Sequence, residues 1–357
     1  MKIIHCSDLH LDSALRTHLT PEKARERSAE LCVAFGRMVR FAVREHVDAV
    51  LIAGDLFDSV HVSGRTADEV IEQIRSAPDI TFFYIRGNHD TRMSSFECRK
   101  LPENLVTFGS QWESHRCGDV VITAIEPEGS GWLNFYEDLK LNPQDLNIVM
   151  LHGQISTQPG IEQIALPLLR GKQIHYLALG HIHAYQKAPL DLDGTYCYCG
   201  CLEGRGFDEC GEKGFVLLET GGGRIQSRFV PFAARHLHEI PVHLTGGETV
   251  TEILHLVEAA AGEIAQEDLV KFVLKGDYTL QTQKDPLFWQ KALAEHFWFV
   301  KIEDQSRLRL DREDYAHDAS LKGEFVRLVL SSDRDEAQKA RIISCGLQAL
   351  SGEEVTL

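Results

Sequence analysis

Five short polar runs each follow an apolar, strand-like stretch, and their side chains are of types that bind metal ions and transfer protons. The side chains in these five runs that could do such chemistry are Asp8, His10, Asp55, Asn88, His89, Asp90, His152, His181 and His183. Carboxylates, imidazoles and one amide suit Mn²⁺, Fe²⁺ or Zn²⁺ better than Ca²⁺ or Mg²⁺. The set is too large for one ion and about right for two. Two cations roughly 3.5–4 Å apart serve in-line displacement at phosphorus, which is the chemistry these residues predict.

Individual residues in this set have different uses. A pair of cations needs an anionic bridge, for which Asp55 is the natural carboxylate. His181 and His183 lie on one side of the chain if it stays extended there. The Asn88 amide offers an oxygen, His89 can bind metal or move a proton, and Asp90 can fix the tautomer of a neighbouring imidazole.

The hydrophobic pattern predicts the strands that position these residues. Strands are expected at residues 2–7, 48–53 and 80–86, with helices from Thr20-Pro21 and over 66–75. This alternation indicates an α/β layer whose functional residues follow the carboxyl ends of strands. Further strands at 119–125, 147–151 and 176–179 precede or end at the later histidines. The Gly221-Gly222-Gly223 run fits a hairpin turn. The pattern resets around 231–235, so a second, small α+β unit is expected, with a final helix over 334–350.

Composition limits the class of protein. The chain has 357 residues, is 43% hydrophobic and carries a net charge of −16, which on average repels a polyanion. Its nine cysteines have no disulfide-framework spacing, and we expect a cytoplasmic protein without a signal peptide or membrane span. Cys197, Cys199 and Cys201 lack the spacing of a zinc site, and small residues on one strand face are the preferred explanation. Trp112, Trp132, Phe135 and Tyr136 are expected to pack a loop rather than stack on bases.

The motifs Asp8-x-His10, Gly54-Asp55, Gly87-Asn88-His89-Asp90, His152 and Gly180-His181-x-His183 resemble, in order, those of the calcineurin-like metallophosphoesterases. The resemblance implies a four-layer αββα sandwich with two metals between its sheets. One metal would take Asp8, His10, Asp55 and His183, and the other Asp55, Asn88, His152 and His181. His89, oriented by Asp90, would assist the leaving group, and a metal-bridging hydroxide would be the nucleophile.

Within that family, the runs Ile4–Ser13, Ala53–Asp58, Gly204–Glu209 and Ser320–Arg327 resemble the SbcD/YhaO group of DNA-repair exonucleases. The resemblance implies a nuclease domain over residues 1–232 and a C-terminal α+β capping domain over 233–357. It implies Mn²⁺ as the metal, DNA as the substrate, and an SbcC-like coiled-coil ATPase and a second copy of the chain as partners. Arg92 is a candidate phosphate contact. Asp58 stands where archaeal and eukaryotic relatives often have His, and either assists catalysis or supports its loop.

Two other functions fit parts of the sequence. A phosphoesterase acting on small molecules or nucleotides would use the same metals, and a non-catalytic scaffold subunit of a DNA-repair ATPase complex would use none. A scaffold has no physical need for clustered buried charge, so the complete ligand set favours an enzyme. A two-metal phosphodiesterase is the function that the residues predict, and the resemblance implies that it acts on DNA as an exonuclease or as a nuclease subunit.

Overall fold

The computed structural model of the chain describes residues 1–15, 19–58, 62–90, 96, 98–279, 282–309, 315 and 317–351. It divides into two compact units, Met1–His236 and Leu237–Leu357. Each unit has its own hydrophobic core. No helix in the described ranges has both the length and the hydropathy needed to cross a bilayer.

The first sheet of the first unit carries three of the predicted polar runs. Its strand order is β14-β13-β1-β2-β3-β4, and the four strands from β1 to β4 run parallel. These strands are β1 (Lys2–Cys6), β2 (Ala49–Ala53), β3 (Thr81–Ile85), β4 (Leu105–Thr107), β13 (Gly214–Gly221) and β14 (Arg224–Pro231). β13 and β14 form the hairpin expected at the glycine run, with Gly221 paired to Arg224. Parallel strands end at one edge, so the residues after β1, β2 and β3 converge.

The second sheet carries the remaining two runs. Its order is β11-β12-β10-β7-β6-β5, with β12, β10, β7 and β6 parallel and the two edge strands antiparallel. Its members are β5 (Glu113–Cys117), β6 (Val120–Ala124), β7 (Leu146–His152), β10 (Tyr176–Gly180), β11 (Gln186–Pro189) and β12 (Thr195–Tyr198). A small parallel pair, β8 (Gln154–Ser156) and β9 (Gln163–Ala165), follows β7. The central strands β7 and β10 are fully buried, as expected where both faces of a sheet are covered.

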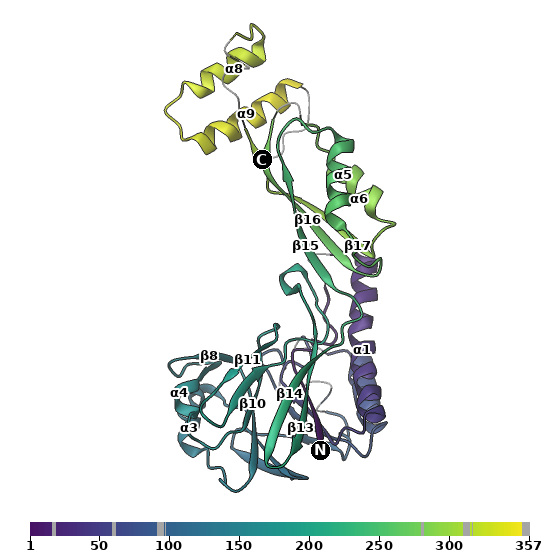
Figure 1. Cartoon of the computed structure of the whole chain (residues 1–357), viewed down its shortest axis with the longest axis vertical. Coiled ribbons are helices and arrows are strands. Elements are labelled where there is room, and N and C mark those ends of the chain that lie inside the picture. The colour runs from purple at the N-terminus through teal and green to yellow at the C-terminus, as the bar shows by residue number, and fades with distance from the viewer. Residues whose placement is uncertain are drawn as a thin grey trace. The chain divides into compact units, whose positions relative to one another are not determined.

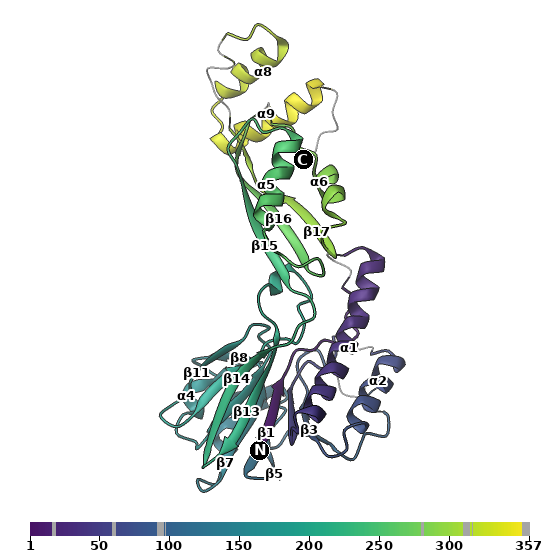
Figure 2. The same ribbon diagram turned by 45° about the vertical axis from the view of Figure 1, so that its right-hand side comes forward.

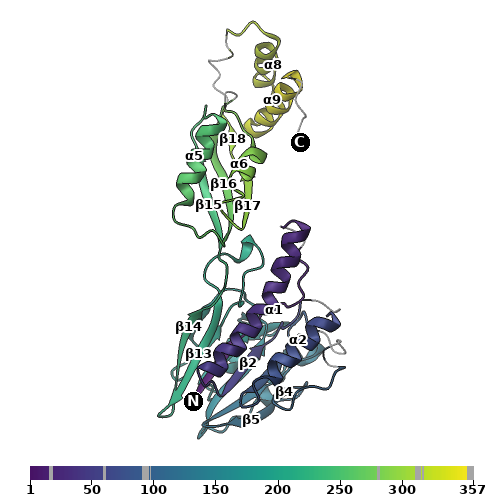
Figure 3. The same ribbon diagram turned by 90° about the vertical axis from the view of Figure 1, so that its right-hand side faces the viewer.

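Helices cover the outer face of each sheet. α1 (Pro21–Arg44) begins at the Thr20 cap, whose hydroxyl accepts from the Lys23 amide, and α1 lies beside α2 (Gly64–Arg75) against the first sheet (Figures 2 and 3). One core lies between these helices and the first sheet, and a second lies between the two sheets. A third core packs the second sheet against η1 (Gly129–Leu133), α3 (Phe135–Asp138) and α4 (Leu166–Leu169). The predicted four-layer αββα sandwich is therefore confirmed.

The second unit contains strands and helices, as the sequence predicts, and its strands run parallel. Its strands β15 (Leu237–Leu244), β16 (Leu269–Tyr278) and β17 (Phe299–Asp304) are parallel, and the two-residue β18 (Arg307–Leu308) also pairs in parallel with β16. The connections contain α5 (Val250–Ala261) and α6 (Pro286–Leu293), which lie on one face of the sheet (Figure 1). A parallel pair needs such a crossover, and both connections are long enough for one. The helix pair α8 (Leu321–Leu330) and α9 (Glu336–Ser351) follows, packed around Val326 and Ile343.

Candidate metal centre

The ends of five strands, three from the first sheet and two from the second, bring the predicted ligands together. Asp8 and His10 follow β1, Asp55 follows β2, and Asn88 follows β3. His152 is the last residue of β7, and His181 and His183 follow β10. The backbone amide of His181 donates to Asp8 Oδ1 at 2.9 Å, which joins the loops of the two sheets.

One candidate group consists of Asp8, His10 and His183. His183 Nδ1 lies 2.7 Å from Glu209 Oε1, and His10 Nδ1 lies 3.0 Å from Asp58 Oδ1, although the His10 ring N–H is not aimed straight at that oxygen. If each Nδ1 carries its proton toward its carboxylate, both Nε2 atoms are lone-pair donors. These two Nε2 atoms are only 3.2 Å apart. Facing lone pairs repel unless a cation or a proton lies between them, so the pair fits one metal ion.

The second group is built around Asp55 and His152, together with Asp8. His152 Nδ1 lies 2.9 Å from the Ala53 carbonyl, so the neutral ring presents its Nε2 lone pair to oxygens. Those oxygens are Asn88 Oδ1 at 3.0 Å and Asp55 Oδ2 at 3.4 Å. Asn88 Oδ1 is also 3.1 Å from His181 Nδ1. Asp55 Oδ2 lies 3.8 Å from His10 Nε2 as well, so the Asp55 carboxylate, like that of Asp8, lies next to both groups.

Buried negative charge is the dominant electrostatic feature of the centre. Asp8 and Asp55 are each only 1% exposed, which is costly for a carboxylate without a cationic partner. Burial raises the pKa of Asp55, but the hydrogen bond and charge of His152 outweigh it and bring that pKa down to about 2. Burial likewise lowers the pKa of His152, but the Asp55 carboxylate raises it more, to about 9. The negative charge of the buried carboxylates holds the proton on His152. Divalent cations would neutralise the same charge, so the donor set fits two of them.

The backbone is strained at four of the predicted ligands. Asp8, His10, Asp55 and His181 have φ values of 53°, 45°, 50° and 106°, in the left-handed region that residues other than glycine rarely adopt. Such strain costs about 1–3 kcal/mol per residue and persists where the surrounding structure requires it. Its concentration in the loops of the centre indicates that these loops are shaped for a site.

Two motif glycines are required by close packing in the centre. Gly54 has φ = 92°, and a Cβ there would overlap the His152 ring. A Cβ on Gly87 would overlap the Asp55 carboxylate. Only glycine lets the backbone pass this close to the ligands.

The structure places Asp90 differently from what the sequence suggests. Its carboxylate accepts the backbone amides of Leu56, Phe57 and Gly87, at 3.1, 2.9 and 3.1 Å. The described contacts of the His89 ring nitrogens are instead with Asp58, whose carbonyl oxygen lies 3.4 Å and whose Oδ1 lies 3.9 Å from His89 Nδ1. Asp90 therefore binds the β2 and β3 loops to each other, and burial together with the Asp55 charge raises its pKa to about 6.

Three residues lie behind the centre. Arg205 and Glu209 were not predicted as site residues, and the role of Asp58 was left open. Asp58 lies against His10, and Glu209 lies against His183. Arg205 contacts both carboxylates, at 2.7 Å to Asp58 Oδ1 and 3.0 Å to Glu209 Oε1. His10, Asp58 and His89 are also close enough to hold an ion, but Arg205 already supplies positive charge there. Arg205 and Glu209 belong to a run that resembles the exonuclease group, which was the one available signal.

The other candidates do not join the ligand set. Cys197, Cys199 and Cys201 are buried with raised thiol pKa values because of that burial, and no cysteine belongs to a potential metal group in the described ranges. Phe135 and Tyr136 are buried in the outer core, as is Trp132, while the Trp112 indole donates to the Phe135 carbonyl. Arg92 lies outside the described residues.

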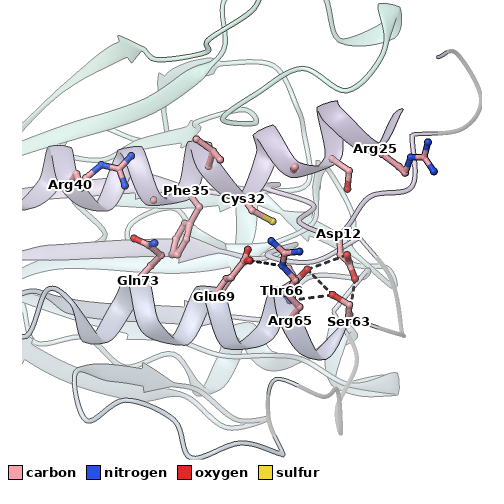
Figure 4. Close-up of a pocket in the computed structure, with 15 residues that line it drawn as sticks. Asp12, Arg25, Cys32, Phe35, Arg40, Ser63, Arg65, Thr66, Glu69 and Gln73 are labelled. Carbon is pink, nitrogen blue, oxygen red and sulfur yellow. Dashed lines mark hydrogen bonds and ion pairs between the residues drawn. The ribbon is translucent and has the colours of Figure 1, made fainter. Parts of the chain in front are cut away.

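Two of the hollows near these loops bear on the centre. One, of about 220 Å³, is lined by Asn88 and His152 of the centre and by acidic residues including Glu126 and Glu162. The other, of about 710 Å³, lies between α1 and α2 and contains none of the predicted ligands (Figure 4). At its rim Asp12 accepts the Ser63 amide at 2.7 Å and the Thr66 hydroxyl at 3.1 Å. Asp12 thereby attaches the loop that carries Asp8 and His10 to the start of α2.

The chain is similar to several known proteins over much of its length. The uncharacterized metallophosphoesterase YhaO of Bacillus subtilis is 27% identical over 338 residues, which cover 86% of this chain and 82% of that protein. The DNA double-strand break repair protein Mre11 of Haloferax volcanii is 25% identical over 370 aligned positions, covering 98% of this chain and 75% of that protein. A dimetal phosphatase structure from Danio rerio aligns over 64% of this chain and 95% of its own at 12% identity, with a TM-score of 0.41.

A family model matches a long continuous segment of the chain. The model described as calcineurin-like phosphoesterase matches residues 1–185, a segment that includes every predicted ligand. The resemblance inferred from the motifs is thus confirmed. Because the match covers more than half of the 357 residues, this chain belongs to the calcineurin-like phosphoesterase family.

Proposed function

We propose that the chain is a two-metal phosphodiesterase that degrades DNA as an exonuclease, with Mn²⁺ as its metal. The observation that carries the proposal is the buried Asp55 carboxylate, whose Oδ2 lies 3.4 Å from His152 Nε2 in one group of metal-binding side chains and 3.8 Å from His10 Nε2 in the other. One ion would be held by Asp8, His10, Asp55 and His183, and the other by Asp55, Asn88, His152 and His181. A shared carboxylate is the arrangement that two-metal phosphoryl-transfer sites need.

When bound, such a pair of cations polarises the phosphate and supplies a nucleophile from water. The remaining steps fall to side chains of the chain. His89 is the proposed acid, because its side chain is 44% exposed beside the centre and its ring meets that of His10 edge-on at 4.8 Å between centroids. Its Nδ1 faces the Asp58 carbonyl and carries a proton there, so the ring must be an imidazolium for Nε2 to give a second proton to the departing oxygen. Asp90 holds the loop that presents His89.

DNA enters the proposal through similarity. The Haloferax volcanii relative is by its name a DNA double-strand break repair protein, and its alignment covers 98% of this chain. In this proposal the first unit is the nuclease domain and the second is the capping domain. The motif resemblance adds an SbcC-like ATPase and a second copy of the chain as partners, which co-purification and the mass in solution would test.

The deciding experiment is hydrolysis of labelled single- and double-stranded DNA beside p-nitrophenyl phosphate mono- and diesters, with and without Mn²⁺. It compares the wild type with His89→Ala and with His46→Ala, a matched change at an exposed histidine outside the centre. We expect DNA degradation that needs metal, falls at least about 100-fold in His89→Ala and is unchanged in His46→Ala. Activity on small esters alone would exclude DNA as the substrate but keep the phosphoesterase. No bound metal and no hydrolysis would support a scaffold instead.

A further inference from the structure

A second row of charged side chains lies directly behind two of the proposed ligands. Asp58 is 3.0 Å from His10 Nδ1, and Glu209 is 2.7 Å from His183 Nδ1. Glu209 is buried, with a side chain only 6% exposed. A carboxylate at Nδ1 fixes the tautomer and orientation of a metal-binding histidine, and leaves Nε2 free for the ion.

One guanidinium joins the two carboxylates. Arg205 donates from Nη1 to Asp58 Oδ1 at 2.7 Å, and to Glu209 Oε1 from Nη2 and Nε at 3.0 and 3.2 Å. The Arg205 backbone amide also donates to Glu209 Oε2 at 2.8 Å. Asp58 receives a further bond from the Ser13 hydroxyl at 2.8 Å. Five donors, four from Arg205 and one from Ser13, thus fix the two carboxylates.

The segment that carries Arg205 is itself anchored in the core of the first unit. Arg27, fully buried in α1, donates to the Gly204 carbonyl at 2.9 Å and to the Glu203 carboxylate at 2.8 Å. Arg37 adds a contact to Glu203 at 3.2 Å. The guanidinium of Arg205 is therefore held in place before any metal or substrate arrives, as a preorganised positioning group requires.

We infer that Arg205, acting through Asp58 and Glu209, is the positioning residue that sets His10 and His183 for a single cation. This inference rests on the proposed two-metal function and assigns the residue that makes one of its two sites tight. Arg205 need not touch substrate. Its planar fork serves two carboxylates at once, which a lysine ammonium cannot reproduce with the same geometry. Among the described residues, no hydrogen bond or ion pair joins Arg205 to Asn88, His152 or His181, which would hold the other ion.

The test is a titration of the metal-free full-length chain with Mn²⁺ in the absence of substrate. The EPR signal of free Mn²⁺ measures how much of the ion remains unbound. The variants are Arg205→Met and Arg205→Lys, with Arg116→Met as the control. Arg116 is an exposed arginine that also pairs with an aspartate, Asp145, at 2.6 Å. We expect two ions per wild-type chain. In Arg205→Met one of the two should bind about 10- to 100-fold more weakly while the other keeps its affinity. Arg205→Lys should fall between, and Arg116→Met should match the wild type.

The outcomes separate the inference from the proposed function. Two ions bound with unchanged affinities in Arg205→Met would overturn the role of Arg205 and leave the two-metal centre intact. Equal weakening of both ions would also overturn it, because a general structural role predicts that result. A wild type that binds no ion would overturn the proposed function itself. If Arg205→Met loses its native circular dichroism, Glu209→Gln keeps the side-chain volume and must give the same one-site loss.

Discussion

A buried histidine between the two sheets gives this protein a pH dependence that can be calculated. His5 lies on β1, is 0% exposed, and its Nδ1 is 2.9 Å from the hydroxyl of Tyr176 on β10. Burial lowers the pKa of His5 from its ordinary 6.5 to about 3. The folded protein therefore keeps this imidazole neutral at pH values where the unfolded chain protonates it.

The sign and the size follow from linkage. Between pH 6.5 and 3 the unfolded state binds the extra proton, so the free energy of unfolding falls as the pH falls through this window. With the two pKa values above, His5 alone lowers it by about 2 kcal/mol at pH 5 and about 3 kcal/mol at pH 4. A residue that cannot ionise removes this loss. We therefore expect His5→Asn to lose about 2 kcal/mol less than the wild type between pH 8 and pH 5.

The assay is urea unfolding of the metal-free chain at pH 8, 6.5 and 5, with a chelator present so that metal release does not contribute. Amide hydrogen exchange of peptides from β1 and β10 reports the unfolding of the first unit. His46→Asn makes the same chemical change at an exposed position and controls for it. His5→Asn can be less stable than the wild type at every pH because packing is lost, so only the difference between pH values counts. Equal losses in the wild type and His5→Asn would refute the reasoning.

Three further predictions concern packing, charge and substrate binding. Gly87→Ala puts a methyl group into the Asp55 carboxylate, and Mn²⁺ titration should show affinity reduced by at least about tenfold, or about 1.4 kcal/mol. Arg27→Met leaves the buried Glu203 with one fewer cationic partner and should lower the free energy of unfolding in urea by about 2–3 kcal/mol, whereas Arg65→Met, at an exposed pair, should leave the unfolding midpoint unchanged. A phosphorothioate oligonucleotide that resists cleavage should bind with Mn²⁺ and not with EDTA, as measured by fluorescence anisotropy; equal binding in both would contradict the two-metal proposal.

The layers of the fold and the location of the centre were predictable because both depend on local sequence. A buried parallel strand is a short apolar run, and the polar residue that follows it lies at the edge where ligands bind. This reasoning placed residues after β1, β2, β3, β7 and β10 at one edge. Strand direction in the second unit was less visible, since the side-chain period of a strand is the same in parallel and antiparallel sheets.

The second row of the centre was not predictable from local patterns. Arg205 and Asp58 are 147 residues apart in sequence, and neither follows a periodic apolar run in a way that predicts their contact. The expected orientation of His89 by Asp90 came from the family resemblance, but His89 lies in a bend after β3, and its ring and the Asp90 carboxylate have different partners. Asp90 turns back to the amides of the β2 loop, while His89 meets Asp58, a residue that sequence reasoning left with two roles open.

The acidic composition is compatible with the proposed DNA substrate because of where the charges lie. In the described part of the centre, the Arg205 guanidinium is already paired with Asp58 and Glu209, so it adds little free positive charge. Asp8 and Asp55 make the metal-free centre negative, and a phosphate would be repelled there. Two divalent cations would reverse the sign of this charge where the proposed function places the phosphate. In the proposed function, the net charge of −16 therefore argues against DNA only for the metal-free chain, and binding of DNA would depend on the metals.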